Sequence, residues 1–171
     1  LVERNIEREF VPLGLELGLG ITVWSPLASG LLSGKYKPSE GNFTGEGRLD
    51  AMRDSQNPAF QKFTEKNWRI VAELEKVAQE MGQSMAQVAV NWVANQPGIA
   101  SVIIGATKLT QLEANIRALD FQIPEELSDR LETVSRPEVQ FPYSFFTPEH
   151  QSLIYGGKPV NLKPAEYYPD R

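Results

Sequence analysis

The sequence has no cysteine, no long apolar run and no excess of positive charge. A chain without cysteine forms no disulfide, thiolate nucleophile or zinc–thiolate site, and it suits a reducing compartment, so we expect a cytoplasmic location. A membrane-spanning helix needs roughly 18 apolar residues in a row, and no run approaches that length, so we expect no membrane partner. The net charge of −5 argues against a nucleic-acid partner, and any phosphate site must be a local basic patch.

Histidine is nearly absent as well. His150 is the only one, and it lies in a stretch rich in proline and aromatic residues. Packing or solvent exposure is therefore a simpler interpretation of His150 than a role beside a substrate. The remaining composition is ordinary for a globular protein, with 171 residues of which 41% are hydrophobic and 23% charged. That length suffices for one domain with a sizeable core.

Helix and strand patterns alternate over residues 1–135. Residues 21–24 predict a short buried strand, and the uncharged run 99–104 predicts a strand buried on both faces. Strands that alternate with helices imply an α/β fold with a parallel sheet. The glycine-rich segment 37–58 has no periodicity and predicts a long loop, while residues 136–171 predict an irregular tail. The predicted helices are residues 4–17 (interrupted at Pro12), 67–81 and 84–92, one marked by Leu112, Ile116 and Leu119, and one opening at Pro124.

The end of the first predicted strand is built to approach a ligand. Proline bars the residue before it from helical geometry, and the small residues that follow leave the backbone bare. Lys35 adds a point charge nearby, so the loop suits an anionic ligand. The alternative is an ordinary strand-to-loop turn. The loop residues are Trp24, Ser25, Pro26, Leu27, Ala28, Ser29 and Gly30.

The second predicted strand ends in the same way, with Gly105, Ala106 and Thr107 before a helix. The N-terminus of a helix presents free N–H groups and partial positive charge to an anion. The next polar residues share one face of that helix, where they could bind a nucleotide, and its apolar residues are expected to face the core. The alternative is a solvated polar face. The polar residues are Lys108, Gln111 and Asn115, and the apolar ones are Leu112, Ile116 and Leu119.

Two segments carry a family resemblance. Residues 24–36 (W-S-P-L-A-S-G-L-L-S-G-K-Y) and 103–119 (I-I-G-A-T-K-L-T-Q-L-E-A-N-I-R-A-L) resemble the C-terminal half of an aldo-keto reductase. The most similar branch holds bacterial general-purpose reductases and potassium-channel β subunits, and the resemblance covers residues 1 to about 135. It implies the C-terminal part of a (β/α)8 TIM barrel, with residues 21–24 and 99–104 as strands 7 and 8 beside their flanking helices. A barrel needs all of its strands to close, so the fold is incomplete as given.

The resemblance also implies a cofactor, NADPH, and its binding residues. Residues 24–30 would line the nicotinamide and pyrophosphate, with Lys35 and Arg48 contacting phosphate from the loop that folds over the cofactor. The adenosine 2′-phosphate end would be held by Thr107, Lys108, Gln111 and Asn115. One departure matters, because the family usually has Glu directly before the Asn, where this chain has Ala114. A contact to the adenine is then altered or lost.

The family's catalytic Asp, Tyr, Lys and His belong to the first half of the barrel, and none of those motifs is present here. We therefore name no catalytic residue, and we expect this chain to be a piece of a longer enzyme that reduces aldehydes or ketones. Its expected partners are the N-terminal barrel half, a small-molecule carbonyl substrate and a further copy of itself. A channel-β-like regulatory subunit that binds NADPH with little turnover is the alternative. A P-loop nucleotidase is excluded, because residues 30–35 are one residue short of G-x4-G-K and Tyr36 replaces the required Ser or Thr.

Overall fold

The computed structural model describes residues 1–39 and 42–158, which divide between two compact units, the first ending at Arg136 and the second beginning at Pro137. Each unit is described by itself. No helix in these described ranges is both long and apolar enough to cross a membrane.

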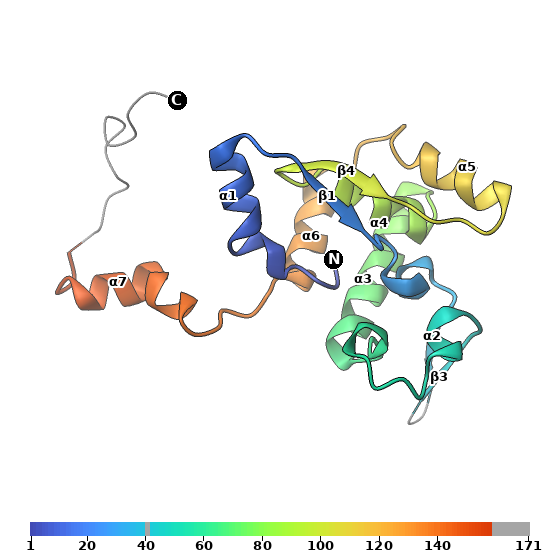
Figure 1. The fold of residues 1–171 in the computed structure, drawn as a ribbon, viewed down its shortest axis with the longest axis horizontal. Coiled ribbons are helices and arrows are strands. Elements are labelled where there is room, and N and C mark those ends of the chain that lie inside the picture. Colours follow the sequence, from blue (N-terminus) through green and yellow to red (C-terminus); the bar gives the residue numbers. More distant parts are fainter. Residues whose placement is uncertain (40–41, 159–171) are drawn as a thin grey trace. The chain divides into compact units, whose positions relative to one another are not determined.

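A two-stranded parallel sheet lies at the centre of the first unit (Figure 1). Strand β1 (Ile21–Trp24) pairs with β4 (Ile99–Ile103), with Trp24 opposite Ile103 and an irregularity after Ile21. Because the strands are parallel, their carboxyl ends lie at the same edge of the sheet. The prediction of an α/β chain with a parallel sheet is confirmed.

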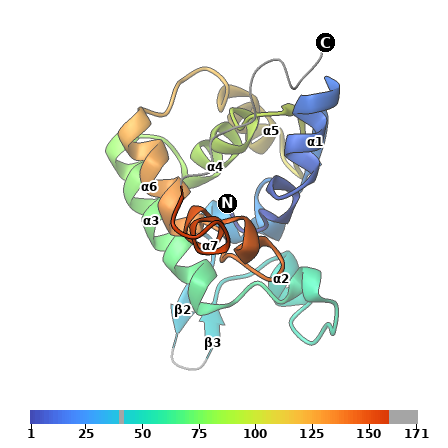
Figure 2. The ribbon, with the colours of Figure 1, turned by 90° about the vertical axis from the view of Figure 1, so that its left-hand side faces the viewer.

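Three helices build the core beside this sheet. Helix α3 (Glu65–Met81) packs against α4 (Met85–Ala94) and α6 (Glu125–Ser135), and α4 contacts β4 (Figure 2). Gly82 ends α3 in a left-handed conformation with φ 63°, and Ser84 and Gln87 form the capping box that opens α4. Both caps were predictable from the sequence. The fully buried side chains of the core include Leu31, Leu32, Tyr36, Leu49, Ile70, Leu74, Val77, Val88 and Leu131.

The segment predicted as a structureless loop is partly regular. It holds an antiparallel hairpin of β2 (Lys37–Ser39) and β3 (Asn42–Thr44), the short helix α2 (Arg48–Ala51) and a 3-10 helix, Pro58–Phe60. Aromatic packing organises it, because the Phe43 ring stacks on Phe63 at 3.6 Å and meets Tyr36 edge-on at 5.8 Å. Packing between aromatic rings at irregular sequence spacings produces no periodic pattern, so the sequence did not indicate these elements.

The prediction that residues 99–104 are buried on both faces is wrong. Helix α4 packs against β4, yet Ile103 is 56% exposed and Trp24 of β1 is 76% exposed. The physical reason is that this sheet has only two strands among the described residues, so part of its apolar surface has no cover.

The helix predicted around Pro12 begins later than expected. A 3-10 turn at Asn5–Glu7 precedes α1 (Phe10–Leu17), which has Pro12 in its first turn, where no intrahelical N–H bond is lost. Its apolar side chains are mostly exposed, including Phe10 at 63% and Leu13 at 53%. Helix α1 therefore presents an uncovered apolar surface.

In the second unit, the segment predicted as an irregular tail contains two short helical elements. A 3-10 helix (Tyr143–Phe146) is followed by α7 (Pro148–Ile154), because Thr147 caps its first turn by accepting a hydrogen bond from the His150 N–H. The His150 ring meets Phe145 edge-on at 4.7 Å. The His150 ring is thus packed against an aromatic side chain, as the first of the two simpler interpretations expected.

Candidate functional site

The two loops singled out by the sequence begin side by side. Trp24 and Ile103 are paired across the sheet, so Ser25 and the segment from Gly105 to Thr107 leave the same sheet edge. In open and closed α/β sheets, the carboxyl ends of parallel strands are where ligands bind.

The backbone of the first loop is strained. Ser25, Ala28 and Ser29 have positive φ angles of 57°, 48° and 58°, and Gly30 follows at 93°. Each non-glycine residue in this region costs roughly 1–2 kcal/mol, and such strain clusters at ligand sites. The loop holds this shape with hydrogen bonds from the Ala28 N–H to the Ser25 carbonyl at 3.0 Å and from the Gly30 N–H to the Leu27 carbonyl at 2.9 Å. The N–H groups of Ala28 and Gly30 are therefore paired within the loop.

Two glycines make room for the Lys35 side chain. A Cβ on Gly30 would lie 2.6 Å from Lys35 Cε and 2.9 Å from its Nζ. A Cβ on Gly47, which belongs to the segment before α2, would also collide with Lys35 Nζ. The ammonium group thus lies between bare backbone of the first loop and bare backbone of the segment that carries Arg48.

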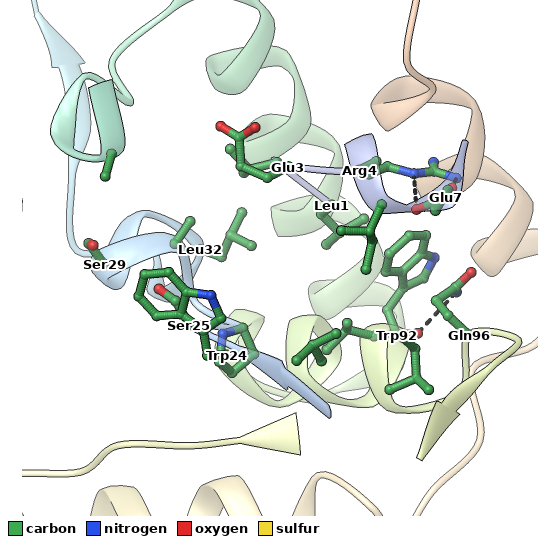
Figure 3. A pocket seen from close by; sticks show the side chains of 18 of the residues that line it. Leu1, Glu3, Arg4, Glu7, Trp24, Ser25, Ser29, Leu32, Trp92 and Gln96 are labelled. Carbon is green, nitrogen blue, oxygen red and sulfur yellow. Dashed lines mark hydrogen bonds and ion pairs between the residues drawn. The ribbon is translucent and has the colours of Figure 1, made fainter. Parts of the chain in front are cut away.

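A pocket of about 1060 Å³ opens beside the first loop (Figure 3). Residues predicted to bind the cofactor line one part of it, and Arg48 adds a positive charge, with its guanidinium 5.6 Å from the Phe60 ring. Leu27, Gly30, Lys35 and the whole segment from Gly105 to Asn115 are not among the lining residues. The predicted residues that do line it are Trp24, Ser25, Pro26, Ala28, Ser29 and Arg48.

The other part of the pocket contains a buried polar group without a partner. Trp92 is 2% exposed, and its indole Nε1 has no hydrogen-bond acceptor among the described residues. Beside it, the Arg4 guanidinium lies 5.2 Å from the indole ring and pairs with Glu7 at 2.6 Å and Glu132 at 2.7 Å (Figure 3). Burial opposes the charge of Arg4, but the hydrogen bonds to both carboxylates outweigh it and raise the pKa of the guanidinium. An unpaired buried donor costs about 1–3 kcal/mol, so Trp92 marks a place where this pocket favours an acceptor.

At the second loop, Gln111 folds back on the strand end. Helix α5 (Leu109–Arg117) begins after Lys108, whose side chain makes no capping hydrogen bond. The Gln111 Oε1 accepts hydrogen bonds from the Thr107 N–H at 3.0 Å and from its hydroxyl at 3.1 Å. One N–H predicted to face a ligand is therefore already paired within the chain.

The predicted faces of α5 are wrong. Asn115 is 6% exposed, whereas Leu112, Ile116 and Leu119 are 39%, 57% and 63% exposed. The cause is Asn91 of α4, which donates hydrogen bonds to the carbonyls of Ala118 at 2.8 Å and Phe121 at 2.7 Å. These bonds turn the Asn115 side of α5 under α4 and leave its apolar side open. Lys108 and Gln111 remain exposed at the start of the helix.

Sequence reasoning missed Gly47, Tyr36 and Trp92 as parts of this region. Tyr36 ends the motif on which the family resemblance rests, but the sequence does not show that its hydroxyl accepts a hydrogen bond from the Leu49 N–H. Gly47 gives no signal beyond being a glycine in an irregular stretch, and Trp92 fits the pattern of a core residue in an apolar helix. Their positions depend on tertiary contacts that no local pattern encodes.

The comparisons with known proteins agree with these observations. The sequence profile of the Aldo/keto reductase family matches residues 1–136. A probable voltage-gated potassium channel subunit beta from Oryza sativa subsp. japonica is 42% identical over 138 residues, covering 78% of this chain and 41% of that protein. L-glyceraldehyde 3-phosphate reductase from Escherichia coli (strain K12) is 37% identical over 106 residues, covering 60% of this chain and 29% of the enzyme.

A third relative reaches further along the chain. The probable aldo-keto reductase 1 of Glycine max is 34% identical over 158 residues, covering 91% of this chain and 44% of its own length. This chain thus spans less than half the length of the curated relatives that it matches. Because the family profile takes in both loops and most of the sequence, this chain belongs to the aldo/keto reductase family.

Proposed function

We propose that this chain is the cofactor-binding C-terminal half of an NADPH-dependent aldo-keto reductase that reduces aldehydes or ketones to alcohols. The observation that carries the proposal is the pair of loops at the carboxyl ends of two adjacent parallel strands, with Lys35 and Arg48 beside the first loop. Barrels of this family type bind phosphate at that end of the strands. The proposed location is the cytoplasm, since a chain without cysteine suits a reducing compartment.

The chain's residues fit an extended ligand that carries two separate anionic groups. The left-handed run from Ala28 to Gly30 supplies bare backbone, and Lys35 and Arg48 supply charge beside it. The exposed start of α5, with Thr107 and Lys108, supplies a second anion-binding end. Two such ends at one sheet edge suit the pyrophosphate and the 2′-phosphate of NADPH better than a single small anion.

Each group would hold a different part of the ligand. Residues 24–28 would lie against the nicotinamide and pyrophosphate, with Leu27 contributing backbone, and Lys35 and Arg48 would neutralise phosphate oxygens. Gly105 and Ala106 leave the backbone open before α5, where Thr107, Lys108 and Gln111 would bind the 2′-phosphate. Asn115, being buried, would contribute less than its sequence position suggests. When bound, the nicotinamide supplies a hydride to the carbonyl carbon of the substrate.

The N-terminal barrel half is the expected partner of this chain. The uncovered apolar surface of β1, β4, α1 and α5 supports a protein segment that covers it. The groups that protonate the substrate oxygen would come from that half. We therefore expect the 171 residues alone to hold cofactor contacts without catalysing turnover.

The test is a titration of the full-length polypeptide that contains this chain with NADPH and with NADH, followed by carbonyl-dependent oxidation of NADPH. We expect NADPH to bind about tenfold more tightly than NADH, because 2′-phosphate contacts to cationic and N–H groups are charge-assisted. Equal affinity for the two nucleotides would contradict the assignment of α5 to the 2′-phosphate. Absence of binding to either would overturn the proposed function.

A regulatory subunit is the second candidate. It is favoured by the relatives from Oryza sativa and Arabidopsis thaliana, both described as probable voltage-gated potassium channel subunits beta. Such a subunit would bind NADPH with similar affinity but oxidise it slowly with any carbonyl compound. Single-turnover measurements on the NADPH-loaded protein separate the two candidates, because a reductase oxidises the bound NADPH rapidly when a carbonyl substrate is added, whereas the regulatory subunit oxidises it slowly.

A further inference from the structure

Tyr36 links the first loop to the segment that carries Arg48. Its side chain is fully buried, and its hydroxyl accepts a hydrogen bond of 3.0 Å from the Leu49 N–H. The ring is fixed by edge-on contacts with Phe43 at 5.8 Å and Phe63 at 5.4 Å. The hydroxyl is therefore an immobile acceptor at a defined place in the core.

The helix that contains Leu49 is too short to be stable without contacts to the rest of the chain. Helix α2 spans only Arg48–Ala51, and one helical turn does not persist without outside contacts. Leu49 makes two such contacts: its side chain is fully buried in the core, and its N–H donates a hydrogen bond to the Tyr36 hydroxyl. Tyr36 thus helps to set the direction in which Arg48 leaves the backbone, together with the Phe60 ring beside the guanidinium.

The Lys35 side chain also lies beside the segment that carries Arg48. A Cβ on Gly47 would lie 2.7 Å from the Tyr36 hydroxyl and would also collide with Lys35 Nζ. The backbone at residue 47 therefore passes close to both side chains, one residue before Arg48. The Lys35 ammonium lies 5.1 Å from the centre of the Tyr36 ring, which adds a favourable contact with its face.

We propose that Tyr36 is a positioning residue, whose hydroxyl fixes the start of α2 so that Arg48 and Lys35 face the same phosphate group of the ligand. The inference rests on the proposed function for the identity of that ligand. Tyr36 itself is sealed from the ligand, so its whole effect on binding passes through the segment from Gly47 to Leu49.

The experiment is a double-mutant cycle of Tyr36→Phe and Arg48→Ala in the full-length polypeptide, read out as the dissociation constant for NADPH. Tyr36→Phe keeps the ring and removes the acceptor. We expect Arg48→Ala to raise the dissociation constant about tenfold, because a charge-assisted contact is lost. Tyr36→Phe should raise it about fivefold in the wild-type background and less than twofold in the Arg48→Ala background.

A matched variant controls for a purely structural role. Leu131→Ala removes buried volume from α6 but leaves Tyr36, its aromatic neighbours and the Leu49 N–H in place. It should lower the melting temperature at least as much as Tyr36→Phe while leaving NADPH affinity unchanged. A second measurement needs no variant, since the Leu49 amide should exchange slowly with solvent in the wild-type protein and more slowly still with NADPH bound.

The outcomes separate the two proposals. If the wild-type protein binds NADPH and Arg48→Ala weakens binding, but the effects of Tyr36→Phe and Arg48→Ala multiply, the positioning role is wrong and the proposed function stands. If Tyr36→Phe does not fold, rapid exchange of the wild-type Leu49 amide would likewise overturn the positioning role alone. If the wild-type protein does not bind NADPH, both proposals fail.

Discussion

Lys35 is the residue on which the proposed phosphate contact most depends. Its ammonium reaches bare backbone on two segments, and no acidic side chain pairs with it among the described residues. We predict that Lys35→Ala in the full-length polypeptide raises the dissociation constant for NADPH about tenfold, measured by fluorescence titration. Lys37→Ala is the matched control, because Lys37 is two residues away but pairs with Glu75 at 2.7 Å. An equal loss in both variants would assign the effect to overall charge.

Gln111 tests the other end of the site. Its Oε1 is held by Thr107, so the side chain is already oriented at the start of α5. We predict that Gln111→Ala weakens NADPH binding several-fold and NADH binding much less, because the lost contact concerns the 2′-phosphate end. The same titration with both nucleotides measures the ratio. A parallel loss for NADPH and NADH would show that Gln111 acts elsewhere.

A substitution at Gly30 tests whether the position of the Lys35 side chain matters for binding, because it displaces the lysine without removing its charge. In Gly30→Ala the new Cβ would lie 2.6 Å from Lys35 Cε and would push the lysine aside, while the positive φ of 93° adds backbone strain. Gly82→Ala is the control, since Gly82 also has a positive φ, 63°, but no atom lies within 4 Å of its Cβ. Both variants should lose roughly 1 kcal/mol of unfolding free energy in urea. Only Gly30→Ala should lose NADPH affinity.

At the scale of elements, α3 and α4 were predictable because their signals are local. The apolar stripe of residues 67–81, the left-handed Gly82 and the capping box at Ser84 all lie within one or two turns of the backbone that they organise. Strand β1 was predictable for a similar reason, because its apolar run is closed by Ser25 and Pro26. These elements carry the fold class and place both loops.

The elements that were mispredicted depend on distant partners. The face of α5 was reversed because Asn91, in another helix, bonds to the carbonyls after residue 117. The hairpin at residues 37–44 was missed because it is held by Phe43 against Phe63 rather than by an alternating pattern. For the site, the sequence could therefore name the loops and their cations, but not the tyrosine and glycine that orient them.

An ion-pair network joins two helices and predicts a pH dependence. Glu73 of α3 accepts hydrogen bonds from Arg130 of α6 at 2.7 Å and from Lys76 at 3.1 Å. Partial burial raises the pKa of the Glu73 carboxyl, but the two hydrogen bonds outweigh it, so that the net pKa is lowered. A carboxyl with a lowered folded-state pKa stabilises the fold above its unfolded pKa of about 4.3, and this contribution is lost as the pH falls through the folded value.

Glu73→Gln should therefore lower the denaturation midpoint at pH 7 and converge with the wild type in acid. Urea unfolding followed by circular dichroism at pH 7 and at several lower pH values measures this difference. Glu113→Gln is the control, because Glu113 and Arg117 form an exposed pair at 3.7 Å within α5. A Glu73→Gln effect that stays constant with pH would mean that packing, and not ionisation, couples α3 to α6.

At the scale of the whole molecule, the main prediction follows from the exposed apolar side chains of β1, β4 and α1. Trp24, at 76% exposed, and Ile103, at 56%, stand on the sheet, and the exposed leucines of α1 add to them. Each fully buried apolar side chain contributes about 1.5–3 kcal/mol, so covering this surface with a complementary protein segment would be strongly favourable. We predict that the 171-residue chain alone shows no carbonyl-dependent oxidation of NADPH, and that co-expression with a protein segment that supplies the proposed N-terminal barrel half produces it.

Trp24 reports on that association directly. It passes from solvent into a covered sheet, so its fluorescence emission should shift to shorter wavelength when the two halves combine. Trp24→Phe should remove most of the shift while still allowing association, which size-exclusion chromatography would detect. The emission that remains comes from Trp68 and Trp92 in this chain. Turnover by the 171 residues alone would contradict the assignment of the catalytic groups to the other half. Restored turnover without any change in Trp24 emission would mean that the apolar surface around β1 is not where the halves meet.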